Sequence, residues 1–498
     1  MNVNPITRLD YPDPDVIRVE DTYYMVSTTM HFMPGCEILQ SFDLVHWEHV
    51  TYVYETLDHT DAQQLKSGQN IYGQGMWAAS LRYHEGRFCI CFVANDTRKT
   101  YLYTSEKIDG PWKKQLIEGF YHDGSLLFDE DGRNYIVYGN DEIWITELNE
   151  DLTAPKKDGL HRLLVSDHKN PELGYEGSHI QKINGYYYIF LIHSLRDRWM
   201  RTEACFYSDS LEGEFTGGDV LCDDRGYCGQ GVAQGGIVDT PDGKWYAMLF
   251  QDSGAVGRIP ILLPVTWKDH FPFFGQNGHV PEEIEVHSTR PGYIYQPLVG
   301  SDDFCNGLLP HWQFNHDPDP RYYHLDALQG TYTITTREVC TELTQAVNTL
   351  TQRMSYPSCA AEVTVDASAL KEGDIAGLCV LQSCYAAVGI TKHHGKYEVL
   401  MLDKKEDGIL DMTEGTVVES HQMDFRLEAD FCNMKDEARC YYRVNKGDWL
   451  PIGTVHKLYF KLDHFTGCRF GLFCYATEET GGSACFRDFK YYDVDEIS

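Results

Sequence analysis

DPDVIRVEDTYYMVST, at residues 13–28, is the first of five related stretches in the N-terminal part of the chain. Each stretch has a short apolar segment, a turn that carries Asp or Gly, and a second segment rich in aromatic residues, which is the pattern of a β-hairpin. The other copies read WAASLRYHEGRFCICFV (77–93), DGSLLFDEDGRNYIVYG (123–139), EGSHIQKINGYYYIFLI (176–192) and QGGIVDTPDGKWYAMLF (234–250). The sequence therefore predicts five repeats of one hairpin unit.

The spacing of these repeats predicts a five-bladed β-propeller over residues 1–300. The turn residues Asp21, Gly86, Gly132, Gly185 and Gly243 are 65, 46, 53 and 58 positions apart, which leaves room for about four strands in each repeat. Helical periodicity is almost absent. We therefore expect an all-β protein whose catalytic or binding domain is a ring of five sheets.

The residues that lead the five stretches are candidates for function, because the first strand of each propeller blade lines the central channel. They are Asp13, Trp77, Asp123, Glu176 and Gln234. Taken singly, each acidic residue is better explained as a turn-forming Asp or a capping Glu than as a functional group. Their shared register instead predicts three carboxylates, one aromatic ring and one amide around the same point on the axis.

Three converging carboxylates are typical of sugar-cleaving enzymes. Glycosidic hydrolysis needs one protonated carboxyl group to donate to the leaving oxygen and one ionised carboxylate to activate water or attack carbon. A third carboxylate raises the pKa of the acid by like-charge repulsion, so Glu176 is expected to stay protonated near neutral pH. The face of Trp77 can stack on a sugar ring.

Other polar residues near these motifs are interpreted as structural. Asp15 and the acidic turn at 129–131 flank the motifs and are expected to be solvated turn charges. His179 lies three positions after Glu176, an odd offset that turns the two side chains to opposite faces of a strand, so we interpret it as a packing residue.

Composition excludes several classes of function. The 75 acidic residues outnumber the 42 Lys and Arg residues, a net charge of −33 that repels nucleic acid and anionic membranes and leaves neutral sugars as better partners. Sixteen Cys without a CxxC pair favour buried reduced thiols over disulfides. With no apolar run of about 20 residues and no secretion signal in MNVNPITRLDYPDPD, we expect a cytoplasmic protein.

The motifs resemble those of glycoside hydrolase family 43, and the resemblance covers nearly the whole chain. NP at residues 4–5 followed by YPDPDVIRVEDTYYMVST is similar to the segment that carries the family's general base, which implies that role for Asp13. HDGSLLFDEDG resembles the blade whose Asp modulates the pKa of the acid, and EGSHIQKINGYYYIF resembles the general-acid blade. These imply Asp123 as the modulator and Glu176 as the acid.

The resemblance also implies substrate-binding residues. YGQGMWAASLRYHEGRF is similar to the family's Trp-containing blade, and GRIPILLPVTW to a segment whose Arg contacts substrate hydroxyls. We therefore expect Trp77, Phe32, Gln234 and Arg258 to bind substrate. Where many members read D-P-S and G-H-G, this chain has D-G-S and A-Q-G, so Gln234 replaces a His that lies near an axial metal or water. We expect no metal and no cofactor, although calcium is compatible with the fold.

A second domain is expected over residues 301–498. Pro and Gly punctuate residues 295–305, and alternating strands such as TYTITT, CAAEVTVDAS and KLYFKLD follow without blade motifs, which predicts a jelly-roll-like β-sandwich. The tail GLFCYATEETGGSACFRDFKYY resembles the sandwich of family xylosidases, which implies a domain that closes the active site to a pocket. A separate carbohydrate-binding module is the alternative.

The leading functional hypothesis is an exo-acting, inverting hydrolase that releases xylose from the non-reducing end of short xylo- or arabinoxylo-oligosaccharides. An α-L-arabinofuranosidase is the nearest alternative, since both pentoses present similar hydroxyls. An endo-arabinanase is disfavoured because it needs an open cleft. From another class, a non-catalytic sugar-binding propeller remains, although binding alone does not require a base opposite an acid. A homo-oligomer is compatible with the sequence.

Overall fold

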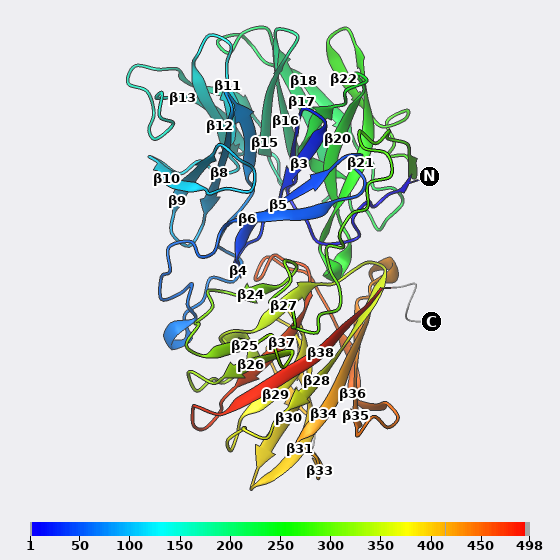
Figure 1. Ribbon diagram of the computed structural model, residues 1–498. Coiled ribbons are helices and arrows are strands. Elements are labelled where there is room, and N and C mark those ends of the chain that lie inside the picture. Colours follow the sequence, from blue (N-terminus) through cyan, green and yellow to red (C-terminus); the bar gives the residue numbers. More distant parts are fainter. Residues whose placement is uncertain (1, 414, 494–498) are drawn as a thin grey trace.

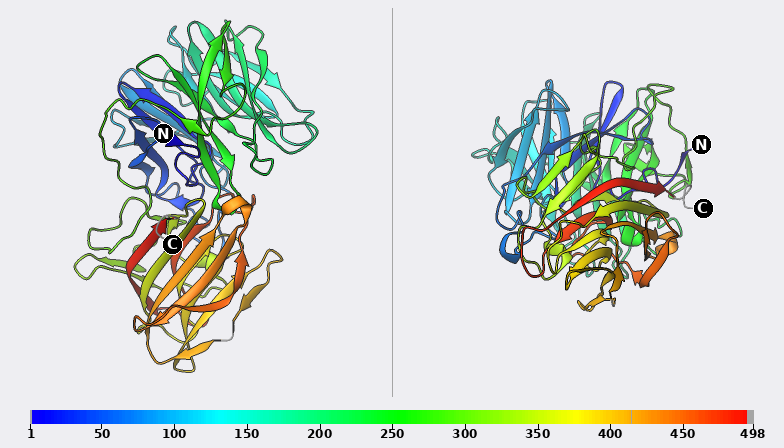
Figure 2. Two further views of the ribbon diagram at one scale, coloured as in Figure 1. Left: turned by 90° about the vertical axis from the view of Figure 1, so that its right-hand side faces the viewer. Right: turned by 60° about the horizontal axis from the view of Figure 1, so that its bottom comes forward.

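The computed structural model describes residues 2–413 and 415–493, which form two β domains stacked end to end (Figures 1 and 2). The only helical segments in these ranges are four short 3-10 turns at Lys66–Gly68, Gly254–Val256, Leu343–Gln345 and Cys432–Met434. Among the described residues, no helix is long and apolar enough to cross a membrane. The predicted all-β class, a five-bladed propeller followed by a β-sandwich, is confirmed.

The propeller consists of five four-stranded sheets, four of which are built from consecutive strands of the chain, while the first omits β4. The first holds β2 (Asp15–Val19), β3 (Thr22–Val26), β5 (Gly35–Ser41) and β6 (Glu48–Tyr54), and the second β7 (Ser80–His84), β8 (Arg87–Ala94), β9 (Lys99–Ser105) and β10 (Lys113–Ile117). The third holds β11 (Ser125–Phe128), β12 (Asn134–Asn140), β13 (Glu142–Leu148) and β14 (His161–Ser166). The fourth holds β15 (Glu176–Ile183), β16 (Tyr186–Ser194), β17 (Arg201–Ser208) and β18 (Thr216–Leu221), and the fifth β19 (Ala233–Asp239), β20 (Trp245–Asp252), β21 (Arg258–Lys268) and β22 (Phe271–Phe274).

The N-terminal segment ties the two ends of the propeller together. β1 (Asn2–Val3) pairs with β23 (Glu283–Ile284), which follows the last blade. The buried side chain of Asn4 donates to Leu262 O at 2.7 Å and accepts from Leu262 N at 3.0 Å. Because the first and last blades are neighbours in the ring, these contacts hold the first blade, and with it Asp13, in a fixed place.

The leading residues do not all occupy the same position of their blades. Asp13, Asp123 and Gln234 each lie two residues before the continuous strand pairing of their hairpin, and they share left-handed φ angles of 53°, 48° and 58°. In the fourth blade the residue at that position is Gly177, with a φ of 64°. Glu176 therefore stands one position earlier than strict equivalence predicts.

Turn length is the reason for this one-residue difference. In the fourth blade the hairpin turn is the pair 184–185, whereas in the third blade five residues, 129–133, connect the strands. The residue nine positions before the turn glycine therefore occupies different positions relative to the first strand in the two blades. The predicted register is correct for Asp13, Asp123 and Gln234, but Trp77 and Glu176 each lie one residue before the equivalent position of their blade.

Two larger sheets form the sandwich, and its main hydrophobic core includes side chains of both. The nine-stranded sheet contains, in order, β32 (Leu410–Met412), β31 (Lys396–Lys404), β30 (Ala386–His393), β29 (Ile375–Leu381), β37 (Arg469–Tyr475), β27 (Leu350–Arg353), β24 (Gln313–Asn315) and β4 (Phe32–Met33), with β33 (Thr416–Val418) on β31. The seven-stranded sheet contains β25 (Tyr323–Asp326), β26 (Thr331–Thr335), β38 (Ser483–Asp493), β28 (Ser358–Asp366), β34 (Gln422–Asp430), β35 (Glu437–Val444) and β36 (Leu450–Lys457).

The two domains share hydrogen bonds and a buried ion pair. The propeller strand β4 pairs with β24 of the sandwich, so one sheet includes residues of both domains. Arg353 of the sandwich donates to Glu37 of the propeller at 2.7 Å, and both side chains are buried. The loop 458–468, between β36 and β37, is bound to the propeller through Gly467 N, which donates to Asp10 Oδ2 at 2.8 Å. The sandwich is therefore fixed against one end of the propeller.

Candidate active site

Three acidic residues meet at the start of the first strands of blades one, three and four. Asp13 and Asp123 are buried, and the side chain of Glu176 is 22% exposed. The left-handed backbone at Asp13 and Asp123 is a conformation that Asp tolerates better than most residues. The charges of Asp13 and Glu176 both raise the pKa of Asp123, so the three groups lie within electrostatic reach of one another.

Both carboxylate oxygens of Asp13 accept hydrogen bonds. Arg258 Nη1 donates to Oδ1 at 2.9 Å, and Thr28 Oγ1 donates to Oδ2 at 2.5 Å. The side chain of Arg258 is 2% exposed, and the backbone N–H of Arg258 donates to Asp10. Asp13 is therefore a fixed carboxylate that acts as an acceptor on both oxygens, an arrangement suited to receiving a proton from water.

The carboxyl group of Asp123 has a raised pKa. Burial raises its pKa most, His122 opposes the shift, and the charges of Glu176 and Asp13 add to it, for a value of about 6. Its Oδ2 accepts from the backbone N–H of Gly177 at 3.0 Å. The chain thus places a carboxyl group that titrates near neutral pH directly beside Glu176.

Glu176 contacts two polar side chains that the sequence did not identify as part of the site. Asn140, the last residue of β12, donates to Glu176 Oε2 at 2.8 Å. His122 Nε2 lies 3.6 Å from the same oxygen and 3.5 Å from Asp123 Oδ2. The charge of Asp123 raises the pKa of His122 most, burial opposes this, and Glu176 adds to it, for a value of about 9. His122 was visible in the motif HDGS, but only the structure shows its two carboxylate neighbours.

Aromatic residues of the sandwich contact Trp77 and Arg258 at the site. Phe465, in the loop 458–468, lies 5.5 Å from Trp77 between ring centroids, and the Arg258 guanidinium lies 4.1 Å from the Phe465 centroid. Phe460 of the same loop is 5.8 Å from Phe465. Trp77 is therefore at the site, and it faces Phe465 of the second domain, which no motif in the sequence indicates.

Gln234 lies beneath the carboxylates and contacts the blade that carries Glu176. Its backbone N–H donates to Glu203 at 2.7 Å, and its side chain packs against Gly177, where any Cβ would approach Gln234 Cγ to 2.7 Å. Gln234 and Asp123 also line a narrow axial cavity of about 10 Å³, close to the space of one water molecule. The structure brings Gln234 to the axis but gives it a packing environment.

Asp15 contradicts the expectation that the acidic residues flanking the motifs are solvated. Asp15 is 1% exposed and accepts from Arg82 at 2.8 Å, and His179 Nδ1 is 3.1 Å from its other oxygen. Burial raises the pKa of Asp15, but Arg82 and His179 outweigh that effect and lower it. His179 does pack as expected, here against a buried ion pair that joins three blades.

The structure does not bring Phe32 to the carboxylates. Its side chain is 2% exposed and lies in a cluster made largely of sandwich residues, including Leu343 and Phe473. The guanidinium of Arg469 lies 3.5 Å from its ring centroid. Because β4 pairs with the sandwich, Phe32 packs between the domains, and a substrate-binding role has no contact to support it.

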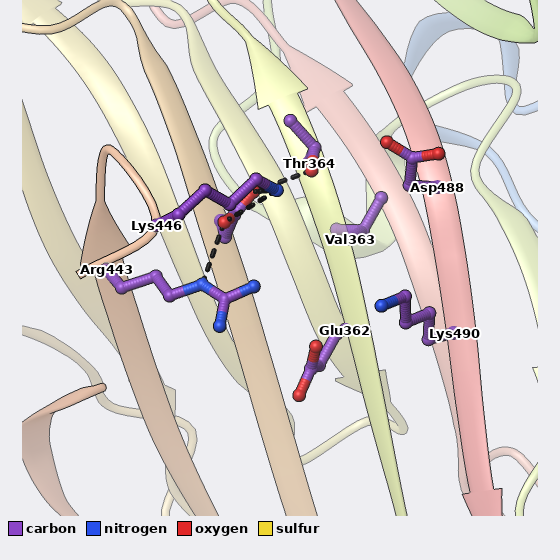
Figure 3. A pocket seen from close by; sticks show the side chains of 8 residues that line it. Glu362, Val363, Thr364, Arg443, Lys446, Asp488 and Lys490 are labelled. Atoms are coloured by element: carbon purple, nitrogen blue, oxygen red, sulfur yellow. Dashed lines mark hydrogen bonds and ion pairs between the residues drawn. The ribbon is translucent and has the colours of Figure 1, made fainter. Parts of the chain in front are cut away.

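A polar groove of about 240 Å³ on the sandwich is lined by charged residues of β28, β34, β35 and β38 (Figure 3). Within it, Asp424 accepts hydrogen bonds from Thr364, Arg443 and Lys446. These charges satisfy one another, and none of the groove's lining residues belongs to the carboxylate site. We interpret the groove as a solvated charge network.

Among the described residues, one group of acidic and imidazole side chains is close enough to share an ion. It consists of His122, Asp123 and Glu176, one ligand atom of each lying within 4.8 Å of the others. The replacement of the axial His by Gln234 was the basis for expecting no metal, and His122 was not considered as a ligand there. A His beside two carboxylates is a donor set that transition metals accept.

Comparison with known proteins identifies relatives for both domains. The family model described as glycosyl hydrolases family 43 matches residues 3–272, and the model described as beta xylosidase C-terminal concanavalin A-like domain matches residues 301–492. Among solved structures, a bifunctional GH43-CE protein of Bacteroides eggerthii is 42% identical over 100% of this chain, with a TM-score of 0.93. This chain spans 64% of that protein's length.

Two curated relatives carry the names of single activities. A beta-xylosidase of Formosa agariphila is 26% identical over an alignment that covers 99% of this chain and 89% of the relative. A non-reducing end alpha-L-arabinofuranosidase of Bacteroides ovatus is 24% identical over 82% of this chain and 79% of the relative. The two names differ in the pentose that is released.

Proposed function

Since the chain belongs to glycosyl hydrolase family 43, we propose that it is an exo-acting, inverting β-D-xylosidase that releases xylose from the non-reducing end of short xylo- or arabinoxylo-oligosaccharides. The observation that carries this proposal is the proximity of the three carboxylates, Asp13, Asp123 and Glu176, at a site that also holds the rings of Trp77 and Phe465. The relative named beta-xylosidase, which aligns over nearly the whole chain, supports the choice of sugar. We place the reaction in the cytoplasm, with imported oligosaccharides as substrates.

Asp13 acts as the general base in this proposal. In an inverting mechanism a carboxylate removes a proton from the water that attacks the anomeric carbon. Arg258 and Thr28 hold both oxygens of Asp13 in place, so the carboxylate needs little reorganisation when the reaction starts. The same guanidinium can bind a substrate hydroxyl with its other N–H groups.

Glu176 acts as the general acid and protonates the leaving oxygen. Its partial exposure fits a group that must reach the substrate, and Asn140 fixes the orientation of its carboxyl group. Asp123 sits between the base and the acid in this network. In this proposal Asp123 orients the sugar and tunes the electrostatics beside the acid, and it is the carboxyl group whose pKa is raised.

The contact between Phe465 and Trp77 supports exo action. Phe465 comes from the second domain and meets Trp77 and Arg258 of the propeller, so the sandwich covers the side of the site where a long polysaccharide would otherwise pass. A covered site accepts a terminal residue more readily than an internal one. The two rings also offer faces for stacking a pentose.

An α-L-arabinofuranosidase is the second candidate. The Bacteroides ovatus relative bears that activity in its name. The carboxylate geometry serves both sugars, because the chemistry at the anomeric carbon is the same and the two pentoses present similar hydroxyl groups. The preference between the two sugars is measured as the ratio of their kcat/KM values.

The test compares hydrolysis of nitrophenyl β-D-xyloside and nitrophenyl α-L-arabinofuranoside by the wild type, Asp13→Asn and Glu176→Gln. We expect turnover by the wild type, with the xyloside preferred, and a loss of roughly 10²-fold or more in each variant. Asp131→Asn and Glu130→Gln, at an exposed turn, are matched controls and should retain full activity. Turnover by Asp13→Asn equal to that of the wild type would refute the base assignment, and sugar binding without any turnover would favour the non-catalytic propeller.

A further inference from the structure

His122 Nε2 lies between two carboxylate oxygens and has no other partner. It is 3.5 Å from Asp123 Oδ2 and 3.6 Å from Glu176 Oε2, and within the described part of the chain it makes no hydrogen bond although the atom is buried. The three side chains come from two neighbouring blades. One nitrogen and two oxygens therefore surround a single point at the mouth of the catalytic site.

These separations match the coordination of a small transition metal. Zinc binds His nitrogen and carboxylate oxygen at about 2.0–2.1 Å, so two ligands of a tetrahedral ion are about 3.3 Å apart. The two measured distances from His122 Nε2 are slightly longer, which a small contraction around an ion corrects. Calcium prefers six to eight oxygen ligands, and magnesium keeps most of its waters, so an imidazole ligand disfavours both.

Hydrogen bonds already fix the two oxygens that face His122. Gly177 N donates to Asp123 Oδ2, and Asn140 Nδ2 donates to Glu176 Oε2. Donors of this kind orient metal-binding carboxylates and change metal affinity strongly when they are removed. The site is therefore built before an ion arrives.

We propose that His122, Asp123 and Glu176 bind one zinc ion, or a similar transition metal such as cobalt, and that the bound ion inhibits the enzyme. With Glu176 coordinated, its oxygen cannot carry the proton for the leaving group. Binding itself stands on the geometry alone, whereas the inhibition rests on the proposed role of Glu176.

Binding is tested by titration calorimetry of the full chain with Zn²⁺ alone, without substrate. We expect one zinc site whose affinity falls more than about tenfold in His122→Gln, because even the loss of a partner behind a ligand costs that much. Glu176→Gln, which removes a different ligand, should weaken binding as well. His84→Gln, at a histidine stacked on Phe128 in another blade, is the matched control and should bind as the wild type does.

Four exposed thiols, Cys222, Cys228, Cys305 and Cys432, can also attract zinc, so the ligand type is read separately with Co²⁺. Cobalt in the proposed site should give visible bands without a thiolate charge-transfer band, and these bands should disappear in His122→Gln. Equal zinc affinity in the wild type and both variants, or a cobalt spectrum of thiolate type alone, would overturn the proposal.

The inhibitory part is measured on the same samples. Zinc should inhibit hydrolysis of the nitrophenyl xyloside by the wild type, a chelator should reverse the effect, and His122→Gln should require at least tenfold more zinc for the same inhibition. Zinc that binds at His122 without slowing hydrolysis would overturn the inhibition. A chain that hydrolyses no glycoside would refute the proposed function, while the calorimetric result would still decide the metal site.

Discussion

Arg258 and Asp13 form a buried ion pair across 245 positions of sequence, with Nη1 of the arginine 2.9 Å from Oδ1 of the aspartate. Arg258 opens a strand of the last blade, and Asp13 precedes the first strand of the first blade. The closure of the ring brings them together. The guanidinium also contacts Phe465 of the sandwich, so one side chain connects the proposed base, the ring closure and the second domain.

Replacing Arg258 should therefore impair catalysis. In Arg258→Gln the carboxylate of Asp13 loses its charged partner and its fixed orientation, and we expect kcat/KM for the xyloside to fall by roughly 10²-fold. The control is Arg290→Gln, which breaks the exposed pair with Asp21 and should leave kinetics unchanged. A change of less than twofold in Arg258→Gln would show that Asp13 needs no such partner.

Phe465 tests whether the sandwich contributes to the pocket. Phe465→Ala removes the ring that faces Trp77, and we expect KM for the xyloside to rise about tenfold, equivalent to the loss of one aromatic contact. Leu462→Ala is the matched control, because Leu462 belongs to the same loop but is 71% exposed. If both variants keep the KM of the wild type, the sandwich does not shape the substrate pocket.

The pKa of Asp123 predicts part of the pH dependence of activity. Burial and the neighbouring carboxylates raise this pKa to about 6, so Asp123 gains a proton as the pH falls through 6 and the site loses the negative charge beside Glu176. We expect kcat/KM, measured with a chelator present, to decrease below pH 6. In Asp123→Asn activity should be low at every pH and should lack this step. An unchanged step in that variant would assign it to another group.

The buried ion pair between Glu37 and Arg353, which joins the two domains, predicts that the stability of the fold depends on pH, over a lower pH range than the activity does. Burial alone would raise the pKa of Glu37, but Arg353 and His49 outweigh it and lower the pKa from 4.5 to about 2. A depressed carboxyl pKa contributes stability that is complete above pH 4.5 and is lost as the pH falls through 2. The shift corresponds to about 3 kcal/mol.

Glu37→Gln should accordingly lower the Tm at pH 7, and the difference from the wild type should narrow at pH 3. Thermal unfolding followed by circular dichroism at both pH values measures this. Asp21→Asn, which breaks an exposed pair with Arg290, should change Tm little at either pH. A difference for Glu37→Gln that is the same at pH 3 and pH 7 would show that charge is not its cause.

The sequence alone was sufficient to predict the propeller and the proximity of its three carboxylates. Hairpin turns recur because strand pairing and tight turns are local, and five local repeats imply a ring. The one-residue error at Glu176 arose from turn length, which spacing alone does not reveal. Asp15 was misjudged for another reason: its partners Arg82 and His179 lie in other blades, so its burial depends on blade packing.

Residues that act across the domain boundary could not be predicted in the same way. Phe465 is 388 positions from Trp77, and its loop carries no motif that indicates a contact with the propeller. Phe32 was expected at the substrate, but the pairing of β4 with β24 directs it into the interface. Contacts between domains depend on docking, which leaves no periodic signal in either partner.

The most direct test of the proposed roles of Asp13 and Glu176 is NMR observation of the first sugar released from a β-xyloside, before mutarotation. An Asp13 that activates water opposite an acidic Glu176 predicts that α-xylose appears first, because attack by water inverts the anomeric carbon. Initial release of β-xylose would mean retention of configuration, and it would contradict the role of Asp13 as the base.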